Sequence, residues 1–386
     1  MKPALKQETL LTQIGRASAT QSVNPPLVRA STTLFRTLAD FKHSYETMVF
    51  ESPQYGRSGT ATTFEFQNAM AQLEGAECCI AVSSGLTAIA AVLGAHARPG
   101  SHLLVYDAVY GRTRVLCEKE LRPLGATVDF FATLDELRAR LTPATALVFI
   151  EVPSSLTMAM LDVEAVCAIA HAHGVPVACD STWGSPVFFR PHALGVDISL
   201  HSATKYISGH SDLMLGTLTG TYEKLEVVRT WCDRYGSHAA PDVCWLALRG
   251  LRTLAVRMPR HHANALAVAH WLQRQPQVRR VLFPALEDDP GHALWQRQFS
   301  GASGLFAIEL ARCSEDACER FYDALTLFGI GTSWGGFESL AMPAIPHHLR
   351  GLKVQPDDGR LVRLHIGLAD PGDLCDDLAQ ALAHIR

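Results

Sequence analysis

The sequence of 386 residues carries little charge and no excess of either sign. Charged residues make up 19% of the chain, below the ~25% that is usual for soluble domains. The 34 Lys and Arg against 38 Asp and Glu give a net charge of −4, which argues against a basic nucleic-acid binder. The hydrophobic share of 48% excludes disorder as the dominant state. We therefore expect two or three domains with a large core.

The sequence also lacks any pair of cysteines with C-x-x-C spacing, although it has ten cysteines. This absence argues against a zinc ribbon and against a thioredoxin-type site. Cys79, Cys167 and Cys179 lie in apolar runs, where a buried thiol is the simpler interpretation. We expect free thiols and a reducing, cytoplasmic location.

Long apolar runs are scarce. The first residues, MKPALKQETLLTQIGR, contain no apolar segment of signal-peptide length, so we expect no secretory signal. The uncharged run 78–97 is interrupted by Ser83, Ser84, Gly85 and Thr87. This pattern favours a buried strand, a turn and a buried helix over a membrane span, and we expect no membrane partner.

What the chain does contain is an alternation of strand and helix patterns, which predicts an α/β fold with a mainly parallel sheet flanked by helices. The predicted strands are 78–84, 102–107, 127–132, 145–152, 175–181 and 198–202. The predicted helices between them are 86–97, 134–141 and 162–174. We assign this pattern to a domain of residues 56–248, preceded by an irregular N-terminal arm of residues 1–55.

The pattern changes near residue 249, where we predict a smaller C-terminal α+β domain of residues 249–386. It would open with a long helix over about 249–275. The other predicted elements are strands 278–283, 304–311 and 361–368 and helices 314–329 and 371–385.

Two predicted strand ends carry candidate binding groups, because ligands of open α/β sheets lie beyond the carboxyl ends of the strands. Gly85 follows one strand and opens a helix, whose first N–H groups could bind a phosphate, although most such turns are only turns. Asp180 follows a buried run, and a buried carboxylate needs a partner. The partner could be a protonated pyridine nitrogen, or Asp180 could simply cap a helix.

Two further residues complete a pattern. Lys205 lies in a run that is poor in other charges, where a desolvated amine can form a Schiff base, although most lysines lie at the surface. Tyr110 could stack on a flat ring or could belong to the core. Taken together, the phosphate turn, the carboxylate, the amine and the aromatic ring fit one ligand, pyridoxal 5′-phosphate (PLP).

The chain resembles the Cys/Met-metabolism family of fold-type I PLP enzymes over nearly its whole length, and within that family its bacterial β-lyases. The stretches that carry the resemblance include 55–75, the Asp180 and Lys205 segments, 249–257, 303–310, 333–340 and 363–368. The resemblance implies the PLP-dependent transferase fold of type I, with a mainly parallel seven-stranded sheet.

The resemblance also implies a role for each matching residue. Lys205 would bond to the cofactor aldehyde, Asp180 would pair with the pyridine nitrogen, and Tyr110 would stack on the ring. Arg363 would bind the substrate α-carboxylate, next to a substrate-binding segment. The remaining assignments are phosphate binding by Gly85, Leu86, Ser202 and Thr204, a contact from Tyr55 and Arg57 to a neighbouring subunit's cofactor, with Tyr55 also near substrate, and substrate binding by Ser333 and Trp334.

The implied reaction is β-elimination of a sulfur amino acid, with L-cystathionine giving homocysteine, pyruvate and ammonia in methionine and cysteine metabolism. The implied assembly is a homotetramer of tight dimers with shared active sites. Many γ-acting relatives carry a glutamate where this chain has Thr332, which favours β-cleavage, whereas Gly111-Arg112-Thr113 is closer to those relatives. A γ-acting enzyme and a broader cysteine-S-conjugate β-lyase therefore stay open.

Two alternatives belong to other classes of protein. A non-catalytic regulator with this fold would be expected to lose Lys205, Asp180 or Arg363, and all three are present. A metal-dependent hydrolase is suggested by the 17 histidines, among them the pairs His171/His173, His261/His262 and His347/His348. Because these pairs lack a third ligand at a suitable spacing, we expect no metal site.

Overall fold

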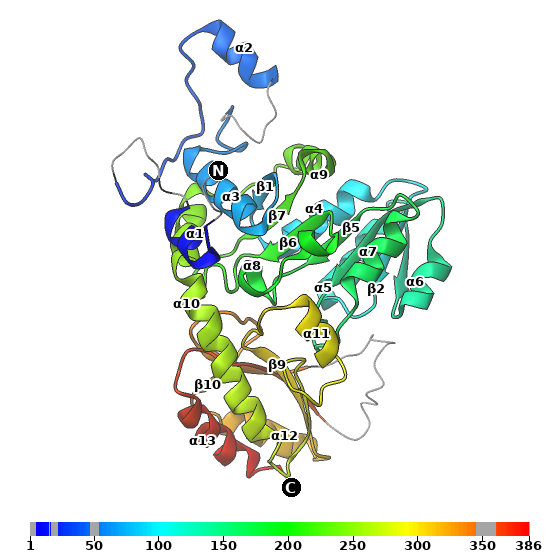
Figure 1. Ribbon diagram of the computed structural model, residues 1–386, viewed down its shortest axis with the longest axis vertical. Coiled ribbons are helices and arrows are strands. Elements are labelled where there is room, and N and C mark those ends of the chain that lie inside the picture. Colours follow the sequence, from blue (N-terminus) through cyan, green and yellow to red (C-terminus); the bar gives the residue numbers. More distant parts are fainter. Residues whose placement is uncertain (1–4, 15, 17–21, 47–53, 345–359, 386) are drawn as a thin grey trace.

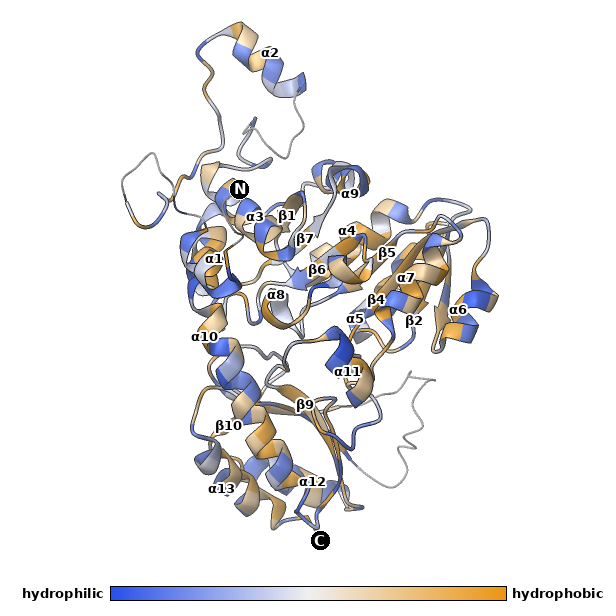
Figure 2. Ribbon diagram, viewed as in Figure 1, coloured by the Kyte–Doolittle hydropathy of each residue, from blue (hydrophilic) through white to orange (hydrophobic). Residues whose placement is uncertain are grey.

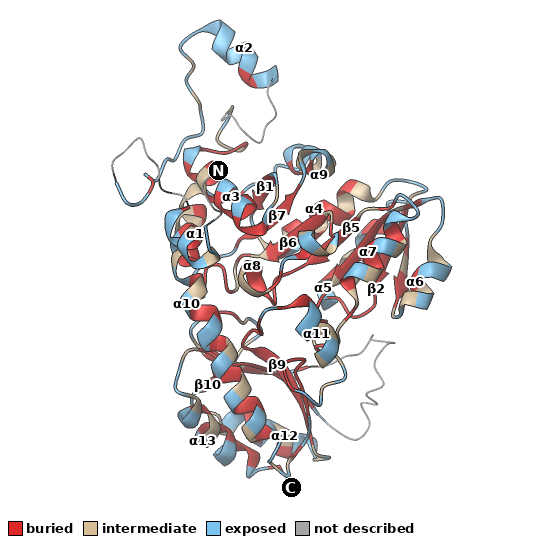
Figure 3. Cartoon of the chain, viewed as in Figure 1, coloured by how far each residue is buried: buried red, intermediate tan, exposed pale blue. Residues whose placement is uncertain are grey.

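The computed structural model describes residues 5–14, 16, 22–46, 54–344 and 360–385. Two β-sheets, each covered by helices, are joined by one long helix, α10 (Pro241–Leu272) (Figure 1). The larger sheet lies in the N-terminal part of the chain and the smaller one in the C-terminal part. Most strands of both sheets are buried (Figure 3), and their apolar residues form the core.

The larger sheet has seven strands in the order β1-β7-β6-β5-β4-β2-β3. The strands β2, β3, β4, β5 and β6 pair in parallel, whereas β7 is antiparallel to both β1 and β6. This confirms the predicted α/β architecture with a mainly parallel sheet. The bounds are β1 Cys78–Val82, β2 His102–Tyr106, β3 Thr127–Phe131, β4 Thr145–Glu151, β5 Val177–Asp180, β6 Ile198–Ser202 and β7 Gly216–Gly220.

Every strand predicted in this sheet is present, but β7 was not predicted. Its sequence, Gly-Thr-Leu-Thr-Gly, contains one large apolar residue and two glycines, which are rare in strands. All five residues are nevertheless buried, because β7 is inserted between β1 and β6. Its pairing on both sides supplies the stability that local propensity does not.

Helices flank this sheet, as predicted. The predicted helices 86–97, 134–141 and 162–174 correspond to α4 (Gly85–His96), α6 (Leu134–Arg140) and α7 (Val163–His171). The other helices of this part are α3 Ala61–Glu74, α5 Gly111–Leu116, the π-helix η2 Cys117–Leu121, α8 Ser185–Phe188, the 3₁₀-helix η3 Pro191–Leu194 and α9 Tyr222–Arg234. Where α4 and α7 pack on the sheet they are rich in apolar residues (Figure 2).

The smaller sheet has five strands in the order β10-β11-β12-β9-β8 and is antiparallel except for the pair β10·β11. The predicted strands appear as β8 (Val278–Leu282), β9 (Leu305–Leu310) and β12 (Leu361–His365). The strands β10 (Phe328–Ile330) and β11 (Ser339–Pro343) were not predicted. The helices here are α11 His292–Gln298, α12 Glu315–Ala324 and α13 Pro371–Leu382.

Two predicted helix bounds were wrong. The helix predicted over 314–329 ends at Ala324, because the chain turns there to enter β10. The long helix predicted from about residue 249 begins at Pro241, where proline occupies the first turn and its missing N–H costs nothing. Helix α10 therefore runs without a break past residue 249.

The expectation of an irregular arm was also wrong in part, because the arm contains α1 (Gln7–Gln13) and α2 (Leu38–Glu46). Leu11 of α1 is fully buried in a cluster with Leu251 and Leu254 of α10. In contrast, α2 extends away from the body of the chain (Figure 1), and most of its residues are exposed.

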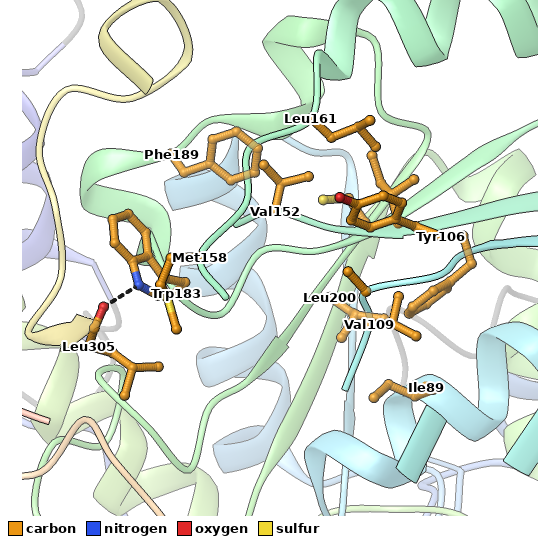
Figure 4. Packing of buried hydrophobic residues seen from close by; sticks show 14 of the residues in the cluster. Ile89, Tyr106, Val109, Val152, Met158, Leu161, Trp183, Phe189, Leu200 and Leu305 are labelled. Carbon is orange, nitrogen blue, oxygen red and sulfur yellow. Dashed lines mark hydrogen bonds between the residues drawn. The ribbon is translucent and has the colours of Figure 1, made fainter. Parts of the chain in front are cut away.

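Trp183 ties the two sheets together just beyond the end of β5. Its indole Nε1–H donates to the carbonyl oxygen of Leu305 in β9 at 2.8 Å (Figure 4). Its ring also makes edge contacts with Phe283 and Phe299. The carboxyl end of β5 is thereby fixed against the smaller sheet, and the candidate site forms where the two meet.

Candidate active site

The predicted site residues of the larger sheet gather at one edge because β1, β4, β5 and β6 all run in the same direction. Asp180 ends β5 and Ser202 ends β6, with Lys205 in the turn that follows, and Glu151, which was not predicted, ends β4 beside them. Gly85 begins α4 just after β1. A parallel sheet thus collects polar groups that are far apart in sequence.

Lys205 lies at the centre of this group. Its ammonium Nζ donates to Ser333 Oγ at 2.8 Å and lies 5.3 Å from the ring centre of Trp334. Burial and, to a smaller extent, the positive charge of Arg363 lower the pKa of Lys205 from 10.5 to about 8, against the opposing effect of Asp180 and Glu338. An amine with this pKa is available as a nucleophile and as a base near neutral pH.

Asp180 is buried and does not cap a helix, since α8 begins at Ser185 after Gly184. Its Oδ1 accepts from the Thr182 amide at 3.0 Å and from the Thr182 hydroxyl at 2.5 Å. Burial raises the pKa of Asp180, against the effect of the Thr182 hydrogen bonds and of His201. Because these bonds use Oδ1, the second oxygen is left for a cationic partner, which would stabilise the charged carboxylate.

The turn at Gly85 lies against Ser202, at the end of β6. A Cβ at residue 85 would come within 2.6 Å of the Ser202 Cβ, so only glycine lets α4 approach so closely. Ser84 caps the helix by accepting from the Thr87 amide at 3.1 Å. The amides of Gly85 and Leu86 are in the first turn of α4, where helix N–H groups lack intrahelical acceptors and can bind an anion.

Ser202 and Thr204 differ in what their side chains do. Ser202 lies at the mouth of this turn, and its amide donates to Thr182 Oγ1 at 2.8 Å. The Thr204 hydroxyl is engaged with Leu215, accepting from its amide at 2.9 Å and lying 3.2 Å from its carbonyl oxygen. A phosphate contact from Thr204 stays a prediction and would have to compete with these bonds.

Tyr110 is half exposed, at the start of α5, and is not a core residue. Its amide donates to Glu151 Oε2 at 2.6 Å. Sequence reasoning did not single out Glu151, although a carboxylate ending the apolar strand 145–152 was the signal available. Burial and the neighbouring Asp180 raise the pKa of Glu151 well above its ordinary value. Glu151 is therefore a second, partly buried carboxyl that positions the stretch carrying Tyr110.

The smaller sheet contributes Arg363 on β12 and the loop 332–336. Arg363 is only 6% exposed, and its Nη2 donates to the carbonyl oxygen of Thr332 at 2.6 Å and lies 3.4 Å from that of Ser333. Burial lowers the pKa of Arg363 to about 10, opposed by Tyr110 and Glu151 nearby. Arg363, Ser333 and Trp334 are thus brought to Lys205, as the resemblance implied.

Tyr55 and Arg57 have contacts elsewhere in the chain. Tyr55 is half exposed and forms a β-bridge with Thr32 of the arm. Arg57 forms an ion pair with Asp233 of α9, and its Nη1 also lies 3.0 Å from the carbonyl oxygen of Asp233. Their predicted contact with a neighbouring subunit's cofactor stays a prediction.

The histidines raised the question of a metal site. Within the described ranges, no group of three or more His, Cys, Asp and Glu side chains is arranged to hold a metal ion. His347 and His348 lie outside the described residues. Likewise, none of the helices in the described part of the chain is both long enough and apolar enough to cross a membrane.

Comparison with known proteins connects this geometry to a family. The family model described as Cys/Met metabolism PLP-dependent enzyme matches residues 8–383. The chain belongs to this family. A cystathionine beta-lyase of Bordetella avium is 43% identical over 97% of both chains, and one of Escherichia coli K12 is 37% identical over 98% of this chain and 99% of its own. A human cystathionine gamma-lyase is 38% identical over 94% of this chain and 89% of its own.

Membership of a PLP-dependent family confirms the predicted cofactor, and the arrangement of side chains fits it. The buried Asp180 has an oxygen left for the pyridine nitrogen, and the amine of Lys205 has the lowered pKa of a Schiff-base lysine. The first-turn amides of Gly85 and Leu86 could bind the phosphate, and the half-exposed ring of Tyr110 could stack on the cofactor. The chain is a PLP-dependent enzyme of this family.

Proposed function

We propose that this enzyme is a carbon–sulfur β-lyase that cleaves L-cystathionine to homocysteine, pyruvate and ammonia. The main observation behind the proposal is the hydrogen bond of 2.8 Å from Lys205 Nζ to Ser333 Oγ, beside the buried Arg363. An amine for proton transfer thus lies next to a guanidinium suited to a carboxylate. The identity of 43% with a cystathionine beta-lyase over almost the whole chain supports the same reaction.

PLP, when bound, supplies the electron sink that stabilises the negative charge left on the substrate Cα. Asp180 would keep the pyridine nitrogen protonated, because the two buried charges stabilise each other. Arg363 would bind the substrate α-carboxylate through two N–H groups and so orient the Cα proton. Lys205 would take that proton, since a pKa of about 8 leaves far more neutral amine than an ordinary lysine has.

The residues around Lys205 also bear on where the substrate is cleaved. Thr332 lies where many γ-acting relatives carry a glutamate, and here its carbonyl oxygen accepts from Arg363. No carboxylate from this position is therefore available for the second proton transfer that chemistry at Cγ requires. The thiolate leaves from Cβ, and cystine or other β-substituted cysteines could react by the same steps, as in a broader cysteine-S-conjugate β-lyase.

The second candidate is a γ-lyase, which the human relative at 38% identity and the Gly111-Arg112-Thr113 segment favour. Incubation with L-cystathionine and identification of the keto acid separates the two. We expect the wild-type enzyme to release pyruvate and the Lys205→Ala variant to release no keto acid. Release of 2-oxobutyrate would overturn the β-lyase proposal, and a folded protein that takes up PLP but releases neither product would point to a non-catalytic regulator.

We further propose that the domains 56–248 and 249–386 form a fold-type I PLP enzyme working in the cytoplasm as a homotetramer of tight dimers. All ten cysteines are free thiols, which supports a reducing compartment. The arm, residues 1–55, exposes large apolar side chains, including Leu34 at 91%, Leu38 at 68% and Tyr45 at 62%. Such surface is expected where a partner subunit packs.

A further inference from the structure

The loop 332–336 lies directly on the backbone of Lys205. Gly335 has a φ of +86°, and a Cβ there would lie 2.9 Å from the Lys205 Cα and 2.8 Å from the Tyr206 amide nitrogen. Only glycine can adopt this conformation at this distance without strain. The position of Ser333 relative to Lys205 therefore depends on how the backbone at Gly335 is held.

His365 of β12 holds that backbone. The Gly335 amide donates to His365 Nε2 at 3.0 Å, and the carbonyl oxygen of Gly336 lies 3.2 Å from the same nitrogen. Because an amide can only donate, Nε2 must carry a lone pair, and the ring proton then belongs on Nδ1. His365 lies two residues beyond Arg363 and so on the same face of β12.

The surroundings of His365 favour this neutral form. The side chain is 1% exposed, and burial lowers its pKa well below the ordinary value, with His261, Arg363 and Lys205 adding to the effect. A neutral imidazole keeps the Nε2 lone pair over the pH range in which the enzyme would work.

His261 of α10 supports the ring from behind. The two imidazole centres are 5.4 Å apart, and His261 Nδ1 is 2.9 Å from the carbonyl oxygen of Ile366, so its proton belongs there. This leaves a donor at His365 Nδ1 and an acceptor at His261 Nε2, and neither buried atom has a hydrogen-bond partner within the described residues. Within the described residues, the two rings therefore pack against each other at an interplanar angle of 37° without a hydrogen bond between them.

We propose that His365 is a positioning residue for the Lys205 amine, fixing the loop 332–336 through Gly335 so that Ser333 Oγ is held 2.8 Å from Lys205 Nζ. The proposal rests on the β-lyase function proposed above, since its effect is on proton transfer by Lys205. One strand, β12, then supplies both the guanidinium for the substrate carboxylate and the anchor of the loop beside the amine.

The experiment compares PLP-loaded variants by pyruvate release and by hydrogen exchange of the 332–337 segment. In H365L we expect the Gly335 amide to exchange at least about tenfold faster and kcat to fall roughly tenfold, because one hydrogen bond is lost. H365Q, whose side-chain oxygen can accept from the same amide, should retain most of the protection of the Gly335 amide and most of the wild-type kcat. The matched control is H262L. It also removes an imidazole that accepts a backbone N–H, but this N–H belongs to Ala302, which lies outside this cluster.

A double-mutant cycle with Ser333→Ala tests whether His365 acts through the loop. The double variant H365L/S333A should have a kcat within about twofold of S333A alone, since the two changes remove one interaction. Effects on kcat that multiply would overturn the proposal, as would unchanged Gly335 exchange in H365L. If H365L does not fold, the shorter H365N replaces it. Hydrogen exchange at Gly335 tests the hydrogen bond from His365 whether or not the enzyme is a β-lyase. Pyruvate release tests the β-lyase reaction itself.

Discussion

At the scale of the residue, the site consists of a few ionisable side chains that lie together in a space largely removed from water. Lys205, Arg363, Asp180 and Glu151 act on one another's pKa, and burial is the largest cause for each of them. With two potential cations and two carboxyls in one place, a change in one group alters the protonation of the others. The amine of Lys205 is the most direct probe of this balance.

The first prediction concerns that amine in protein from which PLP has been removed. We expect the reductive methylation rate of Lys205, followed by peptide mass spectrometry, to rise with pH around a midpoint near 8. In Arg363→Met the midpoint should move to higher pH, because a neighbouring positive charge that favours the neutral amine is gone. The rate at pH 8 should then fall several-fold.

Arg279→Met is the control, since Arg279 is an exposed residue of β8 that pairs with Glu309. A wild-type midpoint close to 10.5, or no shift in Arg363→Met, would refute this account of the Lys205 environment.

Residues of this site were predictable from the sequence to different degrees. Lys205 and Asp180 each stand out as charges in or beside an apolar run, so the neighbouring residues are enough to predict that they are buried. The sequence signal for Glu151 was weaker, and His365 had none of its own. The partner of His365, the Gly335 amide, is about 30 residues away in the chain, and only pairing of β12 in the smaller sheet brings them together.

At the scale of the element, the join between α12 and β10 depends on one carboxylate of α13. Asp377 accepts at Oδ1 from the Thr326 amide and hydroxyl at 2.9 and 2.7 Å, and at Oδ2 from the amides of Leu327 and Phe328 at 2.8 and 3.2 Å. These donors favour the charged form and lower the pKa of Asp377 despite its burial. They explain why the helix predicted to 329 stops at Ala324.

The second prediction is that Asp377→Asn lowers the free energy of unfolding by about 1.5–3 kcal/mol at pH 7, since bonds to a charged group are lost. The folded-state pKa is below the unfolded one, so this stability is present above pH ~4 and is lost as the pH falls through the folded-state value. Urea denaturation at several pH values measures it.

The control is the exposed neighbour Asp376→Asn, which should leave the free energy of unfolding nearly unchanged. Equal effects of the two variants, or a difference that grows toward low pH, would count against the role given to Asp377.

At the scale of the whole molecule, the proposed dimer implies that each active site is completed by a neighbouring subunit. The arm, residues 1–55, carries exposed apolar side chains, and Tyr55 and Arg57 make their contacts with the arm and with α9. If Arg57 serves the cofactor of a neighbouring subunit, each active site contains residues from two chains. Subunits with different defects should then complement each other.

The third prediction tests this with Lys205→Ala and Arg57→Ala, each expected to lose most activity alone. In a mixed dimer, one site carries both defects and the other carries none. Co-expressed at equal levels, the variants should therefore regain about a quarter of wild-type activity, as half the dimers are mixed and one site in two is intact. No recovery, with mixed dimers demonstrated by differential tagging, would instead place Arg57 in the same site as the Lys205 of its own chain.

The sequence by itself determined the alternation of strands and helices, because burial on a parallel sheet needs apolar runs of a given length and period. It also marked Lys205, Asp180 and Gly85, whose chemistry or backbone freedom is unusual in such a setting. Only the tertiary structure decided the insertion of β7, the contact of the loop 332–336 with Lys205 and the support from His365. These depend on contacts between segments far apart in the chain, which local sequence patterns do not encode.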